Sequence, residues 1–248
     1  MTDDSIRTLA AALRDAHTVT ILTGAGVSAE SGVPTFRDAQ EGLWARYRPQ
    51  DLASPEAFTR DPDTVWQWYR WRRDLVRGVE PNAGHHALAA MARTLPDLRL
   101  VTQNVDGLHQ QAGHDGVIEF HGNLFRNRCH ADGRRVDIDD ATDTAPRCPH
   151  CDSRVRPDVV WFGEAIPEQA LAAAVAATQS CDVFMAVGTS AEVYPAAGLI
   201  DLARESGATV AGINPDPTAL SPAFDLRIHE RAAVALPALL ARIQAWHP

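Results

Sequence analysis

Short apolar segments recur along the chain, and their spacing constrains the fold more than any other feature. The first is Val19–Leu22, and similar β-branched or apolar runs follow at Leu98–Val101, Val183–Val187 and Thr209–Ile213. Alanine-rich stretches of helical composition, such as 168–178, separate these runs. Short apolar strands that alternate with helices in this way predict an α/β fold with a parallel sheet covered by helices on both faces.

Two stretches interrupt this alternation and look inserted. The first is aromatic and arginine-rich, and its central helix is predicted to begin with Asp61 as N-cap and Pro62 at the first helical position. The second contains three cysteines and the polar stretch 137–144, which is too poor in apolar residues to pack without help. We therefore predict a Rossmann-like large domain (1–38, 81–125 and 157–248) and a small domain made of a helical insertion (39–80) and a zinc-ribbon-like insertion (126–156).

Composition argues against several classes of protein. The formal net charge is -9, and no basic block is present, so a nucleic-acid backbone is not expected as a partner. No apolar stretch approaches the roughly 20 residues of a membrane span, and the first residues lack a signal-peptide layout, so we expect a cytoplasmic protein without a membrane partner. In a reducing compartment, clustered cysteines indicate a metal site rather than disulfides, and the isolated Cys181 is assigned to the core.

The turn after the first strand reads Gly24-Ala25-Gly26. Glycines at this place let the backbone approach a pyrophosphate, and the N–H groups at a helix start attract anions. The spacing differs from the dehydrogenase pattern, because Ala29 occupies the place of the third glycine. By itself the turn indicates a nucleotide site, or a tight strand-to-helix turn that binds nothing.

Polar residues follow two later strand-like runs. Asn104 and Asp106 come after the strand that ends at Val101, at the carboxyl edge where ligands bind in open α/β sheets. Their side chains suit a ribose and a carboxamide, although they equally suit a stabilised turn. His121 ends another apolar run and could supply a general base near neutral pH, whereas a lone histidine is more often structural.

Taken together, these segments resemble the sirtuin family of NAD-dependent protein deacylases, over nearly the whole chain from Val19 to Leu239. The matching segments occur in the family's order: Gly24–Ser28, Pro34–Arg37, Gln103–Asp106, Phe120–Gly122, Val160–Glu164, Gly188–Ser190 and Asn214. The resemblance implies that NAD is a co-substrate and that acyl groups are removed from lysine side chains of proteins or peptides.

The resemblance also implies which residues form the site, with His121 as the catalytic base. The cofactor-binding residues would be Gly24, Ala25, Gly26, Ser28, Pro34, Phe36, Arg37, Gln103, Asn104 and Asp106, and, toward the adenosine, Gly188, Thr189, Ser190, Asn214 and Ala232. The acyl-lysine peptide would pair as an extended strand with Val160, Trp161, Phe162, Gly163 and Glu164.

In the mechanism that the resemblance implies, nicotinamide leaves the ribose and the acyl oxygen attacks the ribose carbon. This gives an imidate linked to ADP-ribose. His121 then deprotonates a ribose hydroxyl, which attacks the imidate carbon, and water completes the step to give free lysine and O-acyl-ADP-ribose. The alternatives are ADP-ribosyl transfer to a protein and a non-catalytic acyl-lysine or NAD-binding module. The presence of His121, Asn104 and Asp106 argues against the binding module, and the missing third glycine argues against a dehydrogenase.

The acyl preference depends on the first insertion. Tyr69 and Arg72 are three residues apart on the predicted helix and so project from the same face. Composition alone predicts an aromatic core here, with Arg70, Arg72 and Arg73 as its solvated rim. By resemblance, Tyr-x-x-Arg marks the subgroup that removes succinyl and malonyl groups, where the arginine pairs with the acyl carboxylate. Pro49 lies where that subgroup keeps a small residue, so we expect both deacetylation and desuccinylation, without ranking them.

The cysteines predict an incomplete zinc site. Structural zinc commonly takes four ligands from two close pairs. Cys148 and Cys151 form one such pair, whereas Cys129 has Asp132 in the place of its partner. The site is therefore completed by Asp132, His130 or His150, or it has lost its metal.

Overall fold

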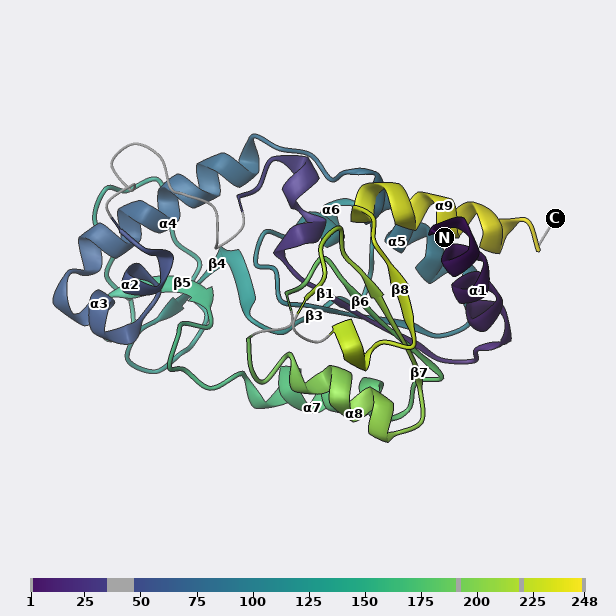
Figure 1. Ribbon diagram of the computed structural model, residues 1–248. Coiled ribbons are helices and arrows are strands. Elements are labelled where there is room, and N and C mark those ends of the chain that lie inside the picture. Colours follow the sequence, from purple (N-terminus) through teal and green to yellow (C-terminus); the bar gives the residue numbers. More distant parts are fainter. Residues whose placement is uncertain (1, 35–46, 191–192, 219–220, 247–248) are drawn as a thin grey trace.

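Figure 1 shows the computed structural model, which describes residues 2–34, 47–190, 193–218 and 221–246. Its main feature is a six-stranded sheet in the order β3-β2-β1-β6-β7-β8, and every neighbouring pair in it is parallel. The strands are β1 (Val19–Thr23), β2 (Leu98–Thr102), β3 (Ile118–Glu119), β6 (Val183–Val187), β7 (Thr209–Ile213) and β8 (Leu226–Ile228). The predicted parallel α/β fold is confirmed.

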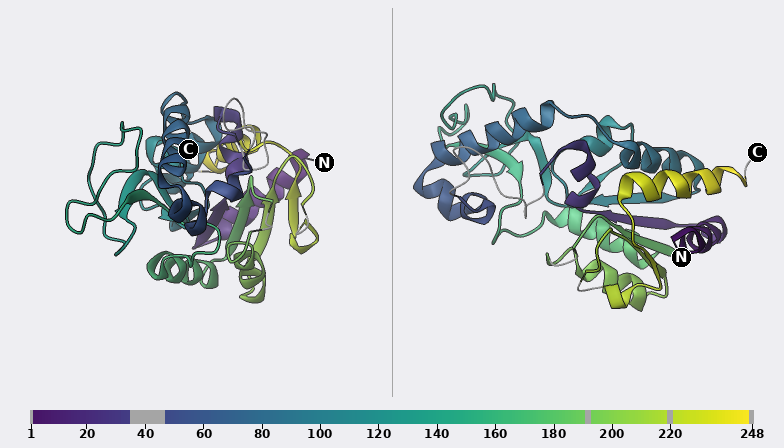
Figure 2. Two further views of the ribbon diagram at one scale, coloured as in Figure 1. Left: turned by 90° about the vertical axis from the view of Figure 1, so that its left-hand side faces the viewer. Right: turned by 45° about the horizontal axis from the view of Figure 1, so that its top comes forward.

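Helices cover both faces of this sheet, as the right-hand view of Figure 2 shows. One face carries α1 (Thr2–Asp15), α5 (Ala83–Thr94) and α9 (Ala232–Gln244), whose apolar sides share one core with the sheet. The other face carries α7 (Glu168–Gln179) and α8 (Gly198–Glu205), which form a second core. Because both faces are buried, central strands such as β1 and β6 are buried along their whole length, which explains their continuous apolar runs.

The order of the strands reverses beside β1. The chain passes from β1 outward to β2 and β3, and then returns to place β6 on the other side of β1. Thr23, Thr102 and Val187 lie opposite one another at the last positions of β1, β2 and β6. In open α/β sheets a ligand crevice forms at such a reversal, outside the carboxyl ends of the strands.

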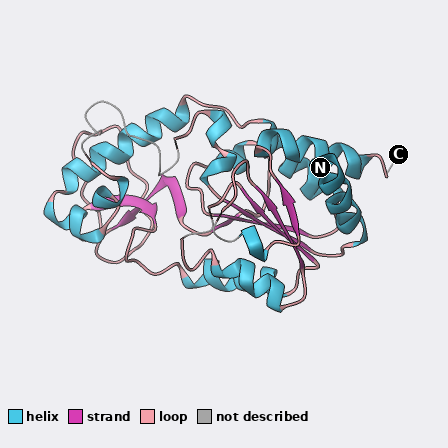
Figure 3. Cartoon of the chain, in the orientation of Figure 1, coloured by secondary structure: helices cyan, strands magenta, loops and turns pink. Residues whose placement is uncertain are grey.

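A smaller group of elements, here called the small module, lies at one end of the molecule (Figures 1 and 3). It comprises an antiparallel pair, β4 (Gly122–Cys129) and β5 (Val155–Val159), packed against α2 (Pro49–Leu52), α3 (Pro55–Arg60) and α4 (Pro62–Arg77).

The predicted start of α4 is confirmed. The Asp61 side chain accepts the Thr64 N–H at 3.1 Å, and Pro62 occupies the first turn. The shorter elements of the described chain are α6 (Leu108–Gln111) and the 3₁₀ turns Ala25–Val27, Ala29–Ser31 and Ser221–Ala223.

The aromatic side of α4 forms the core of the small module, as composition predicts. Trp66, Trp68 and Tyr69 are each at most 2% exposed. The prediction of a solvated arginine rim is wrong for Arg73, which is 1% exposed. Its guanidinium can be buried because its hydrogen-bond donors and its charge all have partners. It donates to the Leu124 carbonyl and to Asn127 Oδ1, both at 2.7 Å, and it pairs with Asp140.

The polar stretch 137–144 is held in place by α4. Trp66 Nε1 donates to the Thr142 carbonyl and Gln67 Nε2 to the Asp143 carbonyl, both at 2.9 Å, and Arg70 donates to the Ala141 carbonyl at 3.1 Å. Side chains of the helix thus replace the apolar contacts that this stretch cannot make. Among the described residues, none of the helices combines the length and the apolar character needed to cross a membrane.

Candidate active site

Two glycine loops meet at the strand-order reversal. Gly26 N–H donates to the Gly188 carbonyl at 2.8 Å. A Cβ atom on Gly24 would lie 2.7 Å from Cβ of Thr189, and one on Gly26 would lie 2.8 Å from the Gly188 oxygen. The glycines are therefore required by the contact between the two loops.

This geometry corrects the expected helix start at Gly24-Ala25-Gly26. The segment continues as 3₁₀ turns, and the N–H groups of Gly24 and Gly26 are bonded to the backbone of the β6 strand and the loop that follows it. These two N–H groups are used within the chain, so an anion must be held by other groups of the crevice.

His121 lies just after β3, at the carboxyl edge. Its Nδ1 is 3.0 Å from the Gln103 carbonyl oxygen. Because a carbonyl only accepts hydrogen bonds, Nδ1 carries the proton and Nε2 keeps its lone pair. Burial lowers the pKa of His121 below its ordinary value, against the opposing effect of the bond to Gln103. The ring is thus a neutral imidazole with a basic nitrogen at neutral pH.

A buried hydrogen-bond network is centred on Ser28, which lies in the loop after β1. Ser28 is 1% exposed and donates to Asp106 Oδ2 at 2.8 Å. Its oxygen lies 3.2 Å from Asn104 Nδ2 and 3.3 Å from His85 Nε2, both of which donate to it. The His85 tautomer follows from Nδ1, which accepts the Asn82 N–H at 3.2 Å. Every hydrogen-bonding group of the Ser28 hydroxyl is therefore used.

The ionisable groups of this network are pushed toward their neutral forms. Burial lowers the pKa of His85 to about 4 and holds the pKa of His109 well below its ordinary value. Burial also raises the pKa of Asp106, although hydrogen bonds from the Leu108 N–H and from Ser28 oppose the rise. The His85 and His109 rings meet edge to face with centroids 4.9 Å apart, which requires that they are not both charged.

His85 and His109 were missed by reasoning from the sequence. The sequence did contain one indication of His85. It lies three residues after Asn82, the spacing at which two side chains can cap a helix start reciprocally, as they do at the start of α5. His109 follows the Gln103–Asp106 segment directly, and its Nε2 lies 3.0 Å from Thr23 Oγ1 at the end of β1.

The amides predicted to bind the cofactor are held by the two loops. Asn104 Nδ2 donates to the Gly24 carbonyl at 3.1 Å as well as to Ser28, so its oxygen is the group that it can offer a ligand. Gln103 Nε2 donates to Thr189 Oγ1 at 3.0 Å, which ties the end of β2 to the loop after β6.

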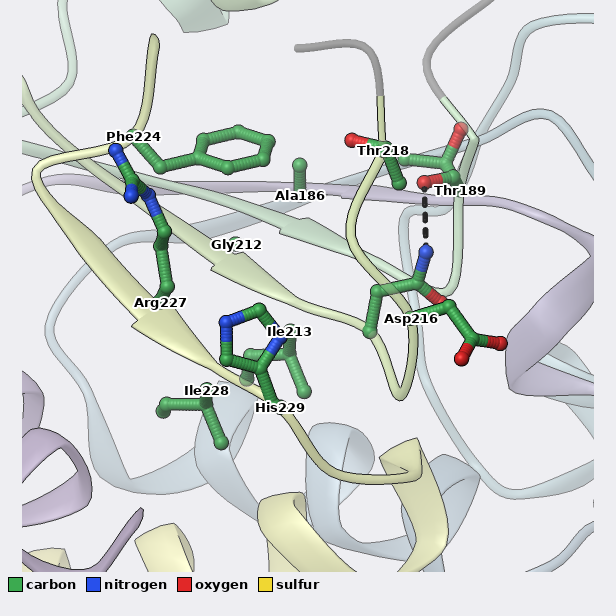
Figure 4. A pocket seen from close by; sticks show the side chains of 11 residues that line it. Ala186, Thr189, Gly212, Ile213, Asp216, Thr218, Phe224, Arg227, Ile228 and His229 are labelled. Carbon is green, nitrogen blue, oxygen red and sulfur yellow. Dashed lines mark hydrogen bonds between the residues drawn. The ribbon is translucent and has the colours of Figure 1, made fainter. Parts of the chain in front are cut away.

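Thr189 and Asn214, which are predicted to hold the adenosine, line a pocket at the ends of β6, β7 and β8 (Figure 4). Asn214 Nδ2 lies 3.5 Å from the Thr189 carbonyl. The pocket has further lining residues that the sequence did not single out: Asp216, Thr218, Phe224, Arg227 and His229. They lie on β8 and its flanking loops, a strand too short to be recognised from the sequence.

The remaining predicted cofactor residues are more scattered. Ser190 is half-buried in the loop after β6, and Pro34 is exposed. Ala232 is buried at the start of α9, where its backbone packs on Gly84 of α5. Phe36 and Arg37 fall outside the described residues.

Tyr69 and Arg72 lie together on α4, as predicted. Tyr69 is buried, its hydroxyl accepts Trp161 Nε1–H at 2.9 Å, and burial raises its pKa to about 12. The Arg72 guanidinium is half-buried and lies 5.1 Å from the centre of the Trp68 ring. Its charge also acts on Asp106, where it opposes the rise in pKa that burial causes. Arg72 is thus close enough to the Ser28 network to link it electrostatically to α4.

The segment Val160–Glu164 differs from the expected extended strand. β5 ends at Val159, and the chain turns at Phe162–Gly163. Several of its N–H groups are already bonded within the chain: Val160 to the His121 carbonyl, Phe162 to the Ala53 carbonyl, and Trp161 to the Glu164 carboxylate.

Glu164 is the anchor of this turn. It pairs with Arg156, which is 3% exposed, and with Arg128 at 3.1 Å. Burial would raise the pKa of Glu164, but hydrogen bonds from Arg156 and from the Trp161 N–H hold it below its ordinary value. The turn is therefore fixed by charged groups that are buried in pairs.

The cysteine cluster lies on the small module. The Sγ atoms of Cys129, Cys148 and Cys151 are all within 4.8 Å of one another, and all four cysteines are free thiols. A cluster of three thiols fits zinc, which prefers thiolate ligands in a tetrahedral arrangement. Cys181 is buried in the core below the sheet, as predicted.

A parallel sheet with a crevice at its strand-order reversal defines a Rossmann-like nucleotide-binding protein. The family model described as the Sir2 family matches residues 24–195. A relative from Ralstonia nicotianae, named NAD-dependent protein deacylase, is 54% identical over 227 residues, which cover 91% of this chain and 92% of the relative.

Solved structures are similar over the whole chain. A Sir2 homolog–NAD complex has a TM-score of 0.92 at 40% identity, covering 98% of this chain and 95% of that one. A Sir2 complex with a deacetylated p53 peptide and 3'-O-acetyl ADP-ribose has a TM-score of 0.83 at 28% identity, covering 95% and 97%. The chain belongs to the Sir2, or sirtuin, family.

Proposed function

We propose that the chain is an NAD-dependent protein-lysine deacylase of the cytoplasm, releasing nicotinamide and O-acyl-ADP-ribose. One observation carries the proposal: His121 lies at the carboxyl edge with Nδ1 bonded to the Gln103 carbonyl, so that Nε2 is free to accept a proton. The relative from Ralstonia nicotianae carries the name of this activity, and the two solved complexes hold NAD or an acetylated ADP-ribose.

In this proposal His121 is the catalytic base. NAD, when bound, would supply the ribose to which the acyl group is transferred. His121 Nε2 would accept the proton of a ribose hydroxyl, because the lowered pKa of the ring keeps this nitrogen unprotonated at neutral pH. The bond from Nδ1–H to Gln103 fixes the ring and disperses the positive charge that it gains.

The other predicted cofactor residues divide between binding and positioning. Asn104 would present its amide oxygen to the nicotinamide end, and Thr189 and Asn214 would hold the adenosine half in the pocket of Figure 4. Ser28 is fully buried and fully bonded, so it would act by fixing Asn104 and Asp106 rather than by touching the ligand.

Tyr69 and Arg72 would receive the acyl chain. A succinyl or malonyl group carries a carboxylate, and the half-buried Arg72 guanidinium could pair with it in a medium where charge-assisted hydrogen bonds are strong. An acetyl group makes no such bond. We therefore propose activity on both classes of acyl-lysine.

The substrate peptide would bind at the turn beside His121. Phe162 is 43% exposed and could contact the peptide, and Gly163, with its φ of +87°, shapes the turn next to it. Because most N–H groups of Val160–Glu164 are already used, peptide pairing here would rely on the remaining carbonyl groups and on the Gly163 N–H. The net charge of -9 favours basic, lysine-containing segments as partners over nucleic acid.

Mass spectrometry of an acyl-lysine peptide incubated with NAD tests the function. We expect loss of the acyl mass from the peptide together with formation of O-acyl-ADP-ribose. His121→Ala should lower kcat by about 10²- to 10⁴-fold. His17→Ala, an exposed histidine at the other end of the sheet, serves as the matched control and should leave turnover unchanged. Transfer of ADP-ribose to protein instead would establish the alternative activity, and unchanged turnover in His121→Ala would remove His121 from the mechanism.

A further inference from the structure

A buried histidine that the proposed function does not use, His109, is joined to Asn104 by a series of hydrogen bonds. His109 lies on α6 and is 1% exposed, and its Nε2 is 3.0 Å from Oγ1 of Thr23, the last residue of β1. The Thr23 hydroxyl donates at 2.8 Å to Oγ1 of Thr102, the last residue of β2. Thr102 Oγ1 also accepts the Asn104 N–H at 3.1 Å. These bonds, here called the threonine path, connect α6 to the backbone of Asn104 across the ends of two strands.

The direction of the threonine path follows from its donors. Because Thr23 uses its hydroxyl hydrogen toward Thr102, its oxygen accepts the bond from His109, so His109 Nε2 carries the ring proton. Burial holds the pKa of His109 well below its ordinary value, so the ring is neutral and Nε2–H is its one N–H donor. The bonds therefore run from the histidine through both threonines, and each donor polarises the next.

The other ring nitrogen of His109 has no partner. Nδ1 is buried and makes no hydrogen bond to any of the described residues. A buried acceptor without a donor costs free energy relative to an apolar side chain of the same shape. Stability alone therefore does not account for a histidine at this place. What an imidazole adds over an apolar ring is the hydrogen bond from Nε2 to Thr23.

Asn104 is held at both its backbone and its side chain. Thr102 accepts its N–H, and its Nδ2 donates to Ser28 Oγ at 3.2 Å. Ser28 also accepts from His85, whose ring meets the His109 ring edge to face. Two hydrogen-bond paths, each beginning at one of these paired histidines, thus meet at Asn104. Together they fix the direction of its amide oxygen before a ligand binds.

We propose that His109 is a positioning residue for NAD. Through Thr23 and Thr102 it fixes the backbone of Asn104, so that the amide oxygen faces the nicotinamide end of the dinucleotide. The inference rests on the proposed function, in which Asn104 binds that end. In this role His109 acts through the two threonines and not by contact with NAD. A binding group that is already ordered costs less entropy when the ligand arrives, which raises affinity.

Binding of NAD and of ADP-ribose to the full-length chain, each measured by isothermal titration calorimetry, tests the proposal. ADP-ribose lacks nicotinamide, so a defect at Asn104 should weaken NAD binding and leave the affinity for ADP-ribose nearly unchanged. His109→Leu should weaken NAD binding by about three- to tenfold, the loss expected for one hydrogen bond. An equal loss for both ligands, or an unchanged affinity for NAD, would overturn the proposal.

His109→Gln is the conservative variant. Its side-chain amide can donate to Thr23 Oγ1, as the imidazole does, whereas leucine fills similar space without a donor. We therefore expect His109→Gln to recover most of the NAD affinity that His109→Leu loses. A glutamine variant that keeps the circular dichroism of the parent, but binds NAD as weakly as the leucine variant, would contradict the role of the Nε2 bond.

A substitution at Thr102 tests the same path without changing α6. Thr102→Val removes the acceptor of the Asn104 N–H and keeps nearly the same side-chain shape, so it should lower NAD affinity by a similar factor. In the double variant with His109→Leu the two losses should not add, because either change interrupts the same path. Fully additive losses would mean that His109 and Thr102 act separately, and the proposal would fail.

Two buried side chains serve as matched controls. His114 is 4% exposed and its Nε2 also lacks a partner among the described residues, but its Nδ1 is bonded to the neighbouring Asp115 carbonyl. Thr20 lies earlier on β1, and its hydroxyl donates to a carbonyl of α7 at 2.9 Å. Whatever their effect on stability, His114→Leu and Thr20→Val should keep the parent affinities for both ligands. A loss of NAD affinity in either control as large as in His109→Leu would assign the effect to a general loosening of the fold and overturn the proposal.

Failure of the proposed function would give a different result from failure of this inference. A parent chain that binds no NAD would contradict the proposed function, and the role of His109 with it. A parent chain that binds NAD, together with a His109→Leu variant of unchanged affinity, would overturn the role of His109 alone.

Discussion

The molecule buries polar side chains in two regions, and it does so in opposite ways. Around the crevice, Ser28, Asp106 and His85 form a network whose ionisable groups are driven toward their neutral forms. In the small module the buried polar groups are charges held in pairs, such as Arg73 with Asp140 and Arg156 with Glu164.

The difference follows from what each region does. A neutral network presents uncharged donors and acceptors at the crevice. A ligand can hydrogen-bond to them without breaking a buried ion pair. In the paired charges, the donors and acceptors already bind one another and the backbone. They therefore hold backbone positions and offer little to a ligand. The crevice is thus built to accept a ligand, and the small module is built to keep its shape.

The largest effect should come from breaking a charged pair of the small module. Arg73→Met leaves Asn127 Oδ1 and the Leu124 carbonyl without their buried donor and leaves Asp140 paired with Arg77 alone, and it should lower the free energy of unfolding by about 3 kcal/mol. Arg70→Met, on the same helix but paired with an exposed Asp143, is the control and should cost about 1 kcal/mol or less. Chemical denaturation measures both, and equal losses would contradict the contrast drawn here.

The neutral network should show itself as a pH dependence of stability. His85 has a folded pKa of about 4, below the ordinary 6.5, so the unfolded chain binds the extra proton first. Stability contributed by the neutral ring is therefore complete above about pH 6.5 and is lost as the pH falls toward 4, by about 3 kcal/mol in total.

Denaturation between pH 4 and 7 tests this slope in the parent and in His85→Gln. The glutamine variant should lose part of the slope, because it has no titratable ring. His86→Gln, exposed on the same helix, should keep it. An unchanged slope in His85→Gln would mean that the pKa of His85 does not differ between the folded and the unfolded chain.

Removing the centre of the neutral network should have a smaller effect on stability. Ser28→Ala leaves Asp106 and Asn104 each short of one hydrogen bond, which should cost about 1–3 kcal/mol. Because Asn104 loses its support, KM for NAD should also rise. Ser206→Ala, on an exposed helix end, is the control. A normal KM in a destabilised Ser28→Ala would limit Ser28 to a structural role.

The smallest effect is expected at Arg72, where the two regions meet. Arg72→Met should lower kcat/KM for a succinyl-lysine peptide by roughly tenfold, the worth of one charge-assisted hydrogen bond. The acetyl-lysine peptide should be turned over at nearly the parent rate. Steady-state kinetics on the two peptides compares them directly, and an equal loss on both would count against recognition of an acidic acyl chain.

Much of the fold could be read from the sequence because it rests on local patterns. The strands β1, β2, β6 and β7 lie where the apolar runs predict them, and Asp61 caps α4. The short β8 was missed because three residues at a sheet edge carry no periodic signal.

The site was less predictable, because its geometry depends on residues far apart in the sequence. The Gly24 turn takes its shape from Gly188, and the Ser28 network depends on His85, which reaches it from another helix. The division into two domains stays a prediction. The small sheet begins at Gly122 and ends at Val159, beyond the predicted 126–156 limits at both ends.

The contact between α4 and the 137–144 stretch joins the helix that carries Tyr69 and Arg72 to the cysteine-containing part of the small module. Trp66 and Gln67 of this helix bind the carbonyl groups of Thr142 and Asp143, shortly before Cys148 in the chain. A ligand that binds only the folded module stabilises it by mass action, in proportion to the logarithm of its free concentration. A metal bound at the cysteine cluster would therefore also stabilise the packing of α4, the helix that we propose meets the acyl chain.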